Sequence, residues 1–209
     1  FEFVARVGRS KIYECPHCEL GYTDKVTGTK KKLYSGSKFY SPKSAAALVD
    51  KYVAKYERVI GRMSMYVNEG KVLDVGGGYG LFSGLLSKEK SFEVTMLEPN
   101  LKPFFLNKFR GVKLFKRVFS KFRGQKRIYS AVTFLDVLEH FKDPISALQR
   151  TRELLKFKGY VIILVPNYKS TMRVLSANWP WWMVEDHHFN FSRTSIKRIL
   201  SQTGFRLRY

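Results

Sequence analysis

Apolar residues in the last two thirds of the chain fall into short runs separated by segments with a helical pattern. Runs of apolar and β-branched residues predict strands at 71–75, 92–97, 112–115, 128–135, 160–165 and 205–209. Apolar residues at three- and four-residue steps predict helices between them, at 79–88, 101–109, 144–156 and 194–203. A longer helix is predicted to begin at Ser41-Pro42 and to end near Gly61. Because the strands lack polar alternation and are separated by helices, we expect an α/β fold with a Rossmann-like, mostly parallel sheet and helices on both faces.

The beginning of the chain has a different pattern. Residues 1–40 carry several glycines, many lysines and little apolar periodicity, which predicts a short, loop-rich N-terminal segment ahead of a single domain at 41–209. Within it, Cys15 and Cys18 have the Cys-x-x-Cys spacing of a metal knuckle. A closed zinc site needs four ligands, and these two are the chain's only cysteines. The pair is therefore either half of a zinc site or two reduced thiols.

Composition limits the class of protein. The chain has 209 residues, 44% of them hydrophobic, which suits one globular domain. Its longest apolar runs, such as YVIILV at 160–165, are too short to span a bilayer. The first residues lack the apolar stretch of a signal peptide, and two cysteines are too few for a disulfide framework. We therefore expect a cytoplasmic protein without a membrane span.

The chain is strongly basic. It has 38 Lys and Arg against 17 Asp and Glu, a formal net charge of +21. Such an excess favours polyanionic partners, namely nucleic acid, phosphorylated metabolites or an acidic membrane surface. It is equally consistent with a solvated basic surface, since the charges are spread along the chain in short clusters. Charge therefore leaves open an anionic or phosphorylated small molecule as ligand.

The sharpest motif is VLDVGGGYG at 72–80, where a strand runs directly into glycines and then a helix. Glycines at this position let the backbone turn tightly and approach a ligand closely. A dinucleotide fingerprint requires G-x-G-x-x-G, but counting from Gly76 its last position falls on Leu81, and from Gly78 on Ser83. The spacing weighs against an NAD-dependent oxidoreductase.

An acidic residue, Glu98, ends the second predicted strand and is followed by Pro99. At the carboxyl end of a parallel strand, a carboxylate can accept hydrogen bonds from both hydroxyls of a ribose. A strand, a glycine loop, a helix, a second strand and a terminal Glu together predict a nucleoside-containing cofactor.

With these motifs, the chain resembles class I S-adenosylmethionine-dependent methyltransferases from about residue 44 to its end. The resemblance also rests on FLDVLEHFKDP at 134–144, GYVIILVPN at 159–167 and HHFNFSRTSIKRILSQTGF at 187–205. It implies that S-adenosylmethionine is the cofactor and S-adenosylhomocysteine the product. The residues that it assigns to cofactor binding are Asp74, Gly76, Gly77, Gly78 and Gly80 at the loop, Glu98 and Pro99 at the ribose, and Leu135 and Asp136 after the fourth strand.

Two positions depart from the family pattern. Many relatives carry an acidic residue after the third strand to meet the adenine amino group, whereas this chain has Lys116 and Arg117 there. Relatives also often have Asp shortly before the fourth strand, at the place of Ser130. Adenine recognition is therefore expected to use backbone groups or another residue.

The aromatic segment 179–192 predicts a substrate lid, in which Trp179, Trp181 and Trp182 either stack on the acceptor or pack the lid. His187 begins the family's His-x-x-x-Phe-Ser pattern. Its catalytic interpretation is a general base or an acceptor-orienting group, and the alternative is a histidine that organises its loop. His140 is expected to cap or orient the loop after the fourth strand.

The function that we expect is methyl transfer to an oxygen, nitrogen or carbon of a small molecule. One alternative is a nucleic-acid methyltransferase, which the charge favours, although the fourth strand ends in LDVLEH and not in the N-P-P-Y type used on base amines. Another is a cofactor-binding protein without catalysis.

The resemblance extends to methyltransferases with an N-terminal Cys-x-x-Cys segment, which implies zinc at Cys15 and Cys18 as half of a zinc ribbon. Oligomeric state is left open.

Overall fold

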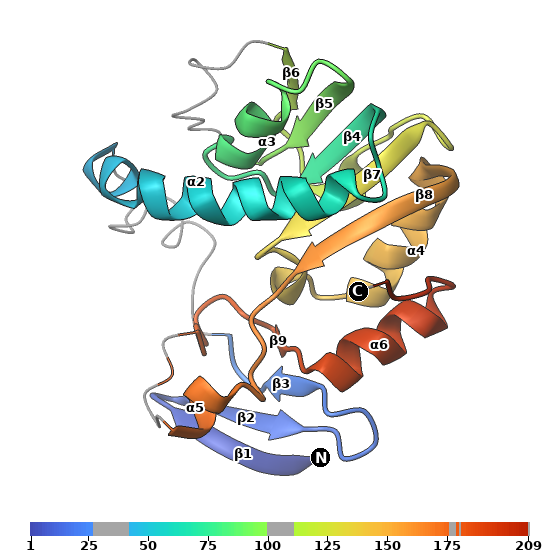
Figure 1. Cartoon of the computed structure of the whole chain (residues 1–209). Coiled ribbons are helices and arrows are strands. Elements are labelled where there is room, and N and C mark those ends of the chain that lie inside the picture. The colour runs from blue at the N-terminus through green and yellow to red at the C-terminus, as the bar shows by residue number, and fades with distance from the viewer. Residues whose placement is uncertain (27–41, 100–110, 176–178, 180, 209) are drawn as a thin grey trace. The chain divides into compact units, whose positions relative to one another are not determined.

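The computed structural model describes residues 1–26, 42–99, 111–175, 179 and 181–208 (Figure 1). Two compact units share the chain. The parallel-sheet unit comprises residues 34–135 and 150–163, and the antiparallel-sheet unit comprises 1–33, 136–149 and 164–209. Each unit is thus assembled from segments distant in sequence.

A five-stranded sheet with the order β6-β5-β4-β7-β8 forms the parallel-sheet unit (Figure 1). Its strands are β4 (Gly70–Val75), β5 (Phe92–Leu97), β6 (Val112–Phe115), β7 (Tyr129–Leu135) and β8 (Leu155–Leu164). The central strand β4 pairs in parallel with β5 and β7, and β5 pairs in parallel with β6. All residues of β7 are buried, which explains its unalternating apolar pattern. The Rossmann-like parallel sheet is confirmed.

Helices flank this sheet. They are α2 (Pro42–Ser64), α3 (Leu81–Leu86) and α4 (Pro144–Leu154). Figure 1 shows α2 running across one face, next to α3. Leu81 and Leu85 of α3 form a buried cluster there, against which Tyr52, Val53 and Tyr56 of α2 pack. The apolar spacing that predicted a helix from Pro42 onward is therefore the face with which α2 covers α3.

Several predicted boundaries shift. The helix expected at 79–88 is shorter because Gly80, with φ 80°, precedes its first residue. The helix expected at 144–156 ends at Leu154, since β8 begins at Leu155. The helix expected at 101–109 lies outside the described residues.

The strand expected at 205–209 is wrong for residues 205–208, which have no regular secondary structure. The preceding helix α6 (Arg193–Gln202) confirms the helix expected at 194–203. Gly204 has φ 79°, and Phe205 N donates to Leu200 O at 2.8 Å. These contacts close the end of the helix, so Phe205 caps α6 and does not pair in a sheet.

The antiparallel-sheet unit contains strands in the order β1-β2-β3-β9. Their bounds are β1 (Glu2–Val7), β2 (Ser10–Glu14), β3 (Gly21–Thr23) and β9 (Phe189–Asn190). A short helix, α5 (Thr171–Leu175), belongs to the same unit. The N-terminal segment therefore has more regular structure than the loop-rich segment that the sequence predicted. Its last partner, β9, lies at the other end of the chain, where no local pattern could reveal the pairing.

Aromatic residues form the core of this second unit. Tyr168, Trp179 and Trp182 are buried together with Ile12 of β2. Trp179 and Trp182 meet edge to face with ring centroids 5.0 Å apart, whereas Trp181 is 44% exposed. Of the two roles expected for these tryptophans, packing therefore accounts for the positions of Trp179 and Trp182.

Candidate functional site

The glycine loop joins β4 to α3. Glycine is needed at its positions for two different reasons, backbone conformation and close packing. Gly76, Gly78 and Gly80 have φ of 70°, 53° and 80°, a left-handed region that favours glycine. Gly77 is required by packing, because a Cβ there would lie 2.5 Å from Met96 Cγ and 2.8 Å from Asp74 Oδ2. At Gly78 a Cβ would meet no atom of the described residues within 4 Å. The loop thus packs inward at Gly77 and leaves open space at Gly78.

Asp74 lies beneath this loop and is 1% exposed. Its Oδ2 accepts a hydrogen bond from Ser83 Oγ at 2.6 Å, and its Oδ1 accepts one from Thr133 Oγ1 at 2.7 Å. Burial raises the pKa of the carboxyl, and the two hydroxyl donors oppose that rise. Asp74 therefore ties together β4, α3 and β7. A direct contact between Asp74 and the cofactor stays a prediction.

Glu98 follows β5 and lies against the same loop. Its side chain is 7% exposed, and Oε2 accepts a hydrogen bond from Gly78 N at 3.0 Å. Leu97 O also accepts from Gly76 N at 2.8 Å and from Gly77 N at 3.2 Å. The structure thus brings together two groups predicted to bind one cofactor, the glycine loop and the ribose carboxylate. Pro99, the next residue, is half-buried.

Leu135 and Asp136 occupy the corresponding end of β7. Leu135 is buried as the last residue of that strand, one position beyond Phe134, the register partner of Val75. Asp136 has φ 56° and donates its N–H to Leu164 O at 2.7 Å. Ligands of open α/β sheets bind beyond the carboxyl ends of the strands, which is where these residues follow β7.

The two departures from the family pattern have different surroundings. Lys116 and Arg117 are exposed directly after β6. Ser130 lies inside β7 and is 2% exposed.

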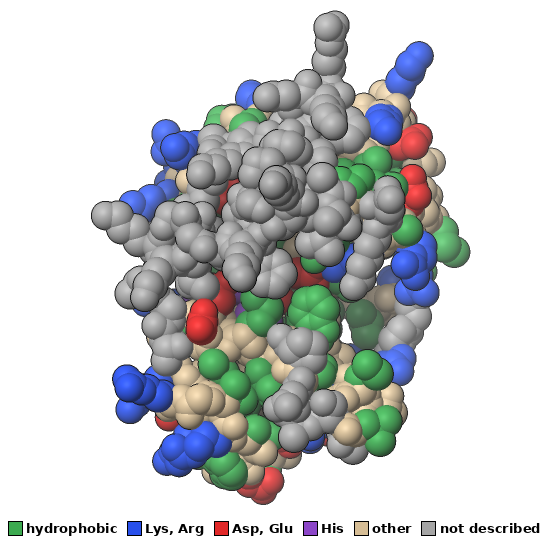
Figure 2. All heavy atoms as spheres, turned by 90° about the vertical axis from the view of Figure 1, so that its left-hand side faces the viewer, with side chains coloured by type: hydrophobic (Ala, Val, Ile, Leu, Met, Phe, Trp, Pro, Cys, Tyr) green, Lys and Arg blue, Asp and Glu red, His purple; other side chains and the backbone are tan. Residues whose placement is uncertain are grey.

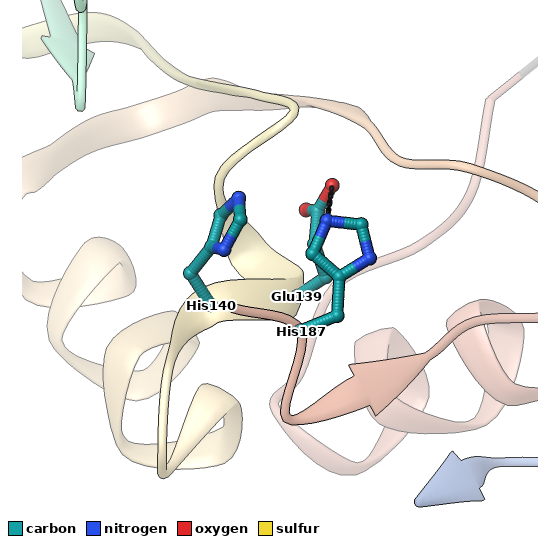
Figure 3. Close-up of side chains that lie close together, drawn as sticks. All are labelled: Glu139, His140 and His187. Carbon is teal, nitrogen blue, oxygen red and sulfur yellow. Dashed lines mark ion pairs between the residues drawn. The ribbon is translucent and has the colours of Figure 1, made fainter. Parts of the chain in front are cut away.

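A second group of chemically active side chains lies in the antiparallel-sheet unit (Figure 3). Glu139 and His140 belong to the short helix η4 (Leu138–His140), and His187 precedes β9. Nε2 of His187 is 3.9 Å from Glu139 Oε1, and the imidazoles of His140 and His187 have centroids 4.7 Å apart. His140 Nδ1 lies 3.1 Å from Asp186 Oδ2.

The two imidazoles have opposite electrostatic surroundings. Burial and the charge of His140 lower the pKa of His187 to about 3. Burial alone would also lower the pKa of His140, but the hydrogen bond and charge of Asp186 outweigh it and raise that pKa. His187 is therefore neutral at physiological pH and a weak base. Its role as general base stays a prediction.

Other parts of the His-x-x-x-Phe-Ser pattern have structural roles. Phe191 is 1% exposed. Ser192 Oγ accepts from Ser195 N at 3.0 Å, and Ser195 Oγ accepts from Ser192 N at 2.8 Å, which forms a capping box at the start of α6. Sequence reasoning missed Glu139 and Asp186 as members of the site. Each directly precedes a histidine, which is a local signal. The contact between His140 and Asp186, however, joins residues 46 positions apart, so no local pattern indicates it.

Cys15 and Cys18 lie together in a turn, where Cys18 N donates to Cys15 O at 3.3 Å. Both are free thiols. Within the described part of the chain, no third Cys, His, Asp or Glu completes a metal site with them. Zinc binding by this pair stays a prediction.

The comparison with known families assigns the chain. A model of the family described as "Methyltransferase domain" matches residues 45–209. The chain belongs to this family. Its domain at 45–209 is thus of the class I S-adenosylmethionine-dependent methyltransferase family, as its motifs indicated.

Curated relatives include ubiquinone biosynthesis O-methyltransferases. The protein from Yersinia enterocolitica is 30% identical over 124 residues, which cover 54% of this chain and 51% of that protein. The protein from Yersinia pestis is 31% identical over 106 residues, 47% of this chain and 43% of the relative. The chain thus spans about half the length of the curated relatives it matches.

Solved methyltransferases share the fold. A SAM-dependent methyltransferase from Aquifex aeolicus has a TM-score of 0.62 at 18% identity, covering 81% of this chain and 91% of the other. A plantazolicin methyltransferase, solved in complex with SAH, has a TM-score of 0.62 at 16% identity, covering 79% and 71%. At such identities the likeness concerns the fold.

Proposed function

We propose that this protein transfers a methyl group from S-adenosylmethionine to a small-molecule acceptor, with oxygen as the first acceptor atom to test. The hydrogen bond between Glu98 and Gly78 N carries the proposal, because it joins the predicted ribose acceptor to the loop with open space at Gly78. The choice of oxygen is supported by the curated relatives, which are named O-methyltransferases.

In the proposed cofactor site, some residues would contact the cofactor and Asp74 would hold the glycine loop in place. The residues proposed to line it are Gly76, Gly77, Gly78, Gly80, Glu98, Pro99, Leu135 and Asp136. Asp74 supports the loop from below through Ser83 and Thr133. The sulfonium of the bound cofactor would supply the methyl group, and the protein's part is to hold donor and acceptor in line.

The described basic residues on one face of the protein do not form the continuous patch typical of nucleic-acid binding. On the face drawn in Figure 2, the described Lys and Arg side chains stand at several separate places and not in one continuous patch. Nucleic-acid binding generally uses a basic patch or stripe. The net charge of +21 nevertheless supports including carboxylated and phosphorylated acceptors in a screen.

Membrane association and location are separate questions. No helix within the described ranges is long and apolar enough to cross a membrane. A cytoplasmic location stays a prediction.

Calorimetric titration with S-adenosylhomocysteine, with NAD as the control ligand, tests the cofactor. We expect binding of the former alone. Methyl transfer from labelled S-adenosylmethionine is then measured with phenols, catechols, amines and their anionic derivatives, and with RNA in parallel. Methylation of RNA without any small acceptor would favour the nucleic-acid alternative. Tight cofactor binding without transfer to any acceptor would favour the non-catalytic one.

A further inference from the structure

One face of the antiparallel sheet carries an aromatic residue on each of its four strands. Phe3 of β1 is the register partner of Tyr13 of β2, and Tyr13 is also the partner of Tyr22 of β3. Tyr22 is in turn the partner of Phe189 of β9. Residues directly opposite each other lie on the same face of a sheet. The four rings therefore form one aromatic row across β1, β2, β3 and β9, which lie side by side in Figure 1.

The aromatic row is open to solvent. Phe3 is 59% exposed and Tyr22 is 41% exposed, and Tyr13 and Phe189 are half-buried. The rings of Phe3 and Tyr13 meet edge to face with centroids 6.1 Å apart. The rings of Tyr22 and Phe189 are tilted by 51° with centroids 6.3 Å apart. Because neither pair is stacked face to face, each pair leaves ring faces that its own partner does not cover.

The opposite face of the same sheet covers the core of the unit. Side chains alternate between the two faces along a strand, so Ile12 points away from the aromatic row. Ile12 packs in the buried cluster with Tyr168, Trp179 and Trp182. The aromatic row therefore lies outside this core, and contiguous exposed apolar surface of this kind marks a binding site.

The charged residues of β1 and β2 are divided between the two faces. Arg6 and Lys11 are register partners, and the alternation along β2 places them on the face of the aromatic row. Glu2 and Glu14 are also register partners, but they lie on the opposite face. Asp24 lies beside Lys11, and its Oδ1 accepts a hydrogen bond from the backbone N of Lys11 at 2.7 Å. Side-chain cations thus accompany the aromatic row, and the two strand carboxylates are directed away from it.

Exposed rings beside cations suit a ligand that has both flat rings and negative charges. Nucleotide bases stack on aromatic side chains, and Lys and Arg neutralise the phosphates that join them. We propose that the aromatic row binds single-stranded RNA. Four-stranded sheets that bind RNA in this way stack two or three bases on their aromatic residues. With strands about 4.8 Å apart, the aromatic row is about 14 Å wide.

The proposed binding depends on stacking more than on charge. Arg6 and Lys11 are too few to hold a polyanion without a further contribution, so the rings must supply most of the affinity. A double helix, whose bases are already stacked and paired, cannot use such a surface. The surface is a docking site for RNA and does not make RNA the methyl acceptor.

The first test measures binding of a short fluorescein-labelled single-stranded RNA to the whole chain by fluorescence anisotropy. We expect saturable binding that the unlabelled strand displaces. A duplex of the same length and a polyphosphate of matched charge should displace it poorly, because they offer phosphates without open base faces. Absence of binding, or equal displacement by either competitor, overturns the proposal.

Substitutions that remove one ring locate the bases. Phe3→Thr and Tyr22→Thr should each weaken binding by about 5- to 150-fold, the range measured for loss of one base–aromatic stack. Threonine retains a β-branched side chain that suits a strand. Tyr22→Phe keeps the ring and should bind normally. Phe157→Thr is the matched control, because Phe157 is an 88% exposed aromatic residue on β8 of the other sheet. Undiminished binding by both ring variants, or an equal loss in the control, overturns the proposal.

Salt dependence tests the role of the two cations. For a single strand, each neutralised phosphate contributes about −0.7 to the slope of log Kobs against log salt concentration. Arg6→Gln and Lys11→Gln should therefore each make the slope shallower by about 0.7. The ring variants should leave the slope unchanged. Slopes that neither charge variant alters would overturn the assignment of the phosphates to this face.

Ultraviolet cross-linking of the unchanged protein to thiouridine-labelled RNA covers the case of a variant that does not fold. Adducts on the peptides of β1, β2 or β3 support the proposal, and adducts confined to the parallel-sheet unit overturn it. Sedimentation of the same samples tests a second copy of the chain as the occupant. Ring variants that change the oligomeric state without changing RNA affinity overturn the proposal. S-adenosylhomocysteine binding is titrated separately, so failure of the cofactor site and failure of this surface are distinguishable.

Discussion

Glu98 Oε2 accepts a hydrogen bond from the backbone N–H of Gly78 at 3.0 Å. The carboxylate proposed to hold the ribose is therefore also a support of the glycine loop. Loop conformation and the proposed ribose recognition would be coupled through this one side chain, because moving Glu98 would release a backbone donor of the loop. In the free protein the contact holds the loop in place before the cofactor binds.

Glu98→Ala should weaken S-adenosylhomocysteine binding by about 1–3 kcal/mol, through loss of charge-assisted hydrogen bonds. Calorimetric titration measures the effect. Glu93→Ala is the matched control, because Glu93 lies on the same strand with its side chain 77% exposed. Equal affinities for the Glu98→Ala variant and the unchanged protein would show that the cofactor pocket lies elsewhere.

Gly78→Arg should abolish cofactor binding and leave the protein folded. The new side chain would extend into open space at Gly78 and occupy the proposed pocket. Its left-handed φ of 53° would cost about 1–2 kcal/mol of stability. Circular dichroism confirms folding and calorimetry measures affinity. A folded variant with normal affinity would contradict the proposed pocket.

Gly77→Ala should lower the free energy of unfolding by about 1–3 kcal/mol, as overpacking of a core does. The added methyl would lie 2.5 Å from Met96 Cγ. Gly61→Ala is the control, and it should raise the free energy of unfolding by about 0.5–1 kcal/mol, because alanine favours helix α2 over glycine. A Cβ at Gly61 would meet no described residue within 4 Å. Urea unfolding measures both. A Gly77→Ala variant as stable as the unchanged protein would exclude the close packing against β5.

Asp74 should make stability fall as pH rises above the ordinary range of a carboxyl group. Its pKa is raised in the folded state by burial, so the folded protein holds the proton to higher pH than the unfolded chain does. The stabilisation is complete below the unfolded pKa, near 3.8, and is lost as pH rises through the folded one. Urea unfolding at several pH values should show a steeper decline for the unchanged protein than for Asp74→Asn. If the free energy of unfolding of the two proteins changed equally with pH, this account would be contradicted.

Gly21→Ala should loosen the pairing of β3 with β9. A Cβ at Gly21 would lie 2.8 Å from Asn190 Cβ and 3.1 Å from Asn190 O. Hydrogen exchange should increase at the amides of Asn190 and of Thr23, which donates to His188 O at 3.1 Å, and β1 with β2 should keep its protection. Unchanged exchange at β9 would show that the close approach is not required.

Local patterns were sufficient for much of the parallel-sheet unit. Unalternating apolar runs predicted β4, β5, β6 and β7, and the strand-to-glycine transition located the loop before α3. Such features depend on contacts among neighbours in sequence and on burial of both faces of the sheet. The resemblance to methyltransferases rested on the same short motifs, and the family match at 45–209 confirmed it.

The remaining features depend on residues that are distant in sequence. By itself, the sequence determined the parallel sheet, the glycine loop and the position of Glu98 at a strand end. Only the tertiary structure decided that β9 completes the N-terminal sheet, that Ser83 and Thr133 hold Asp74, and that Asp186 meets His140. Periodicity reports which face of an element is apolar. It carries no information about which polar side chains meet across a fold, because that depends on how the chain returns to itself.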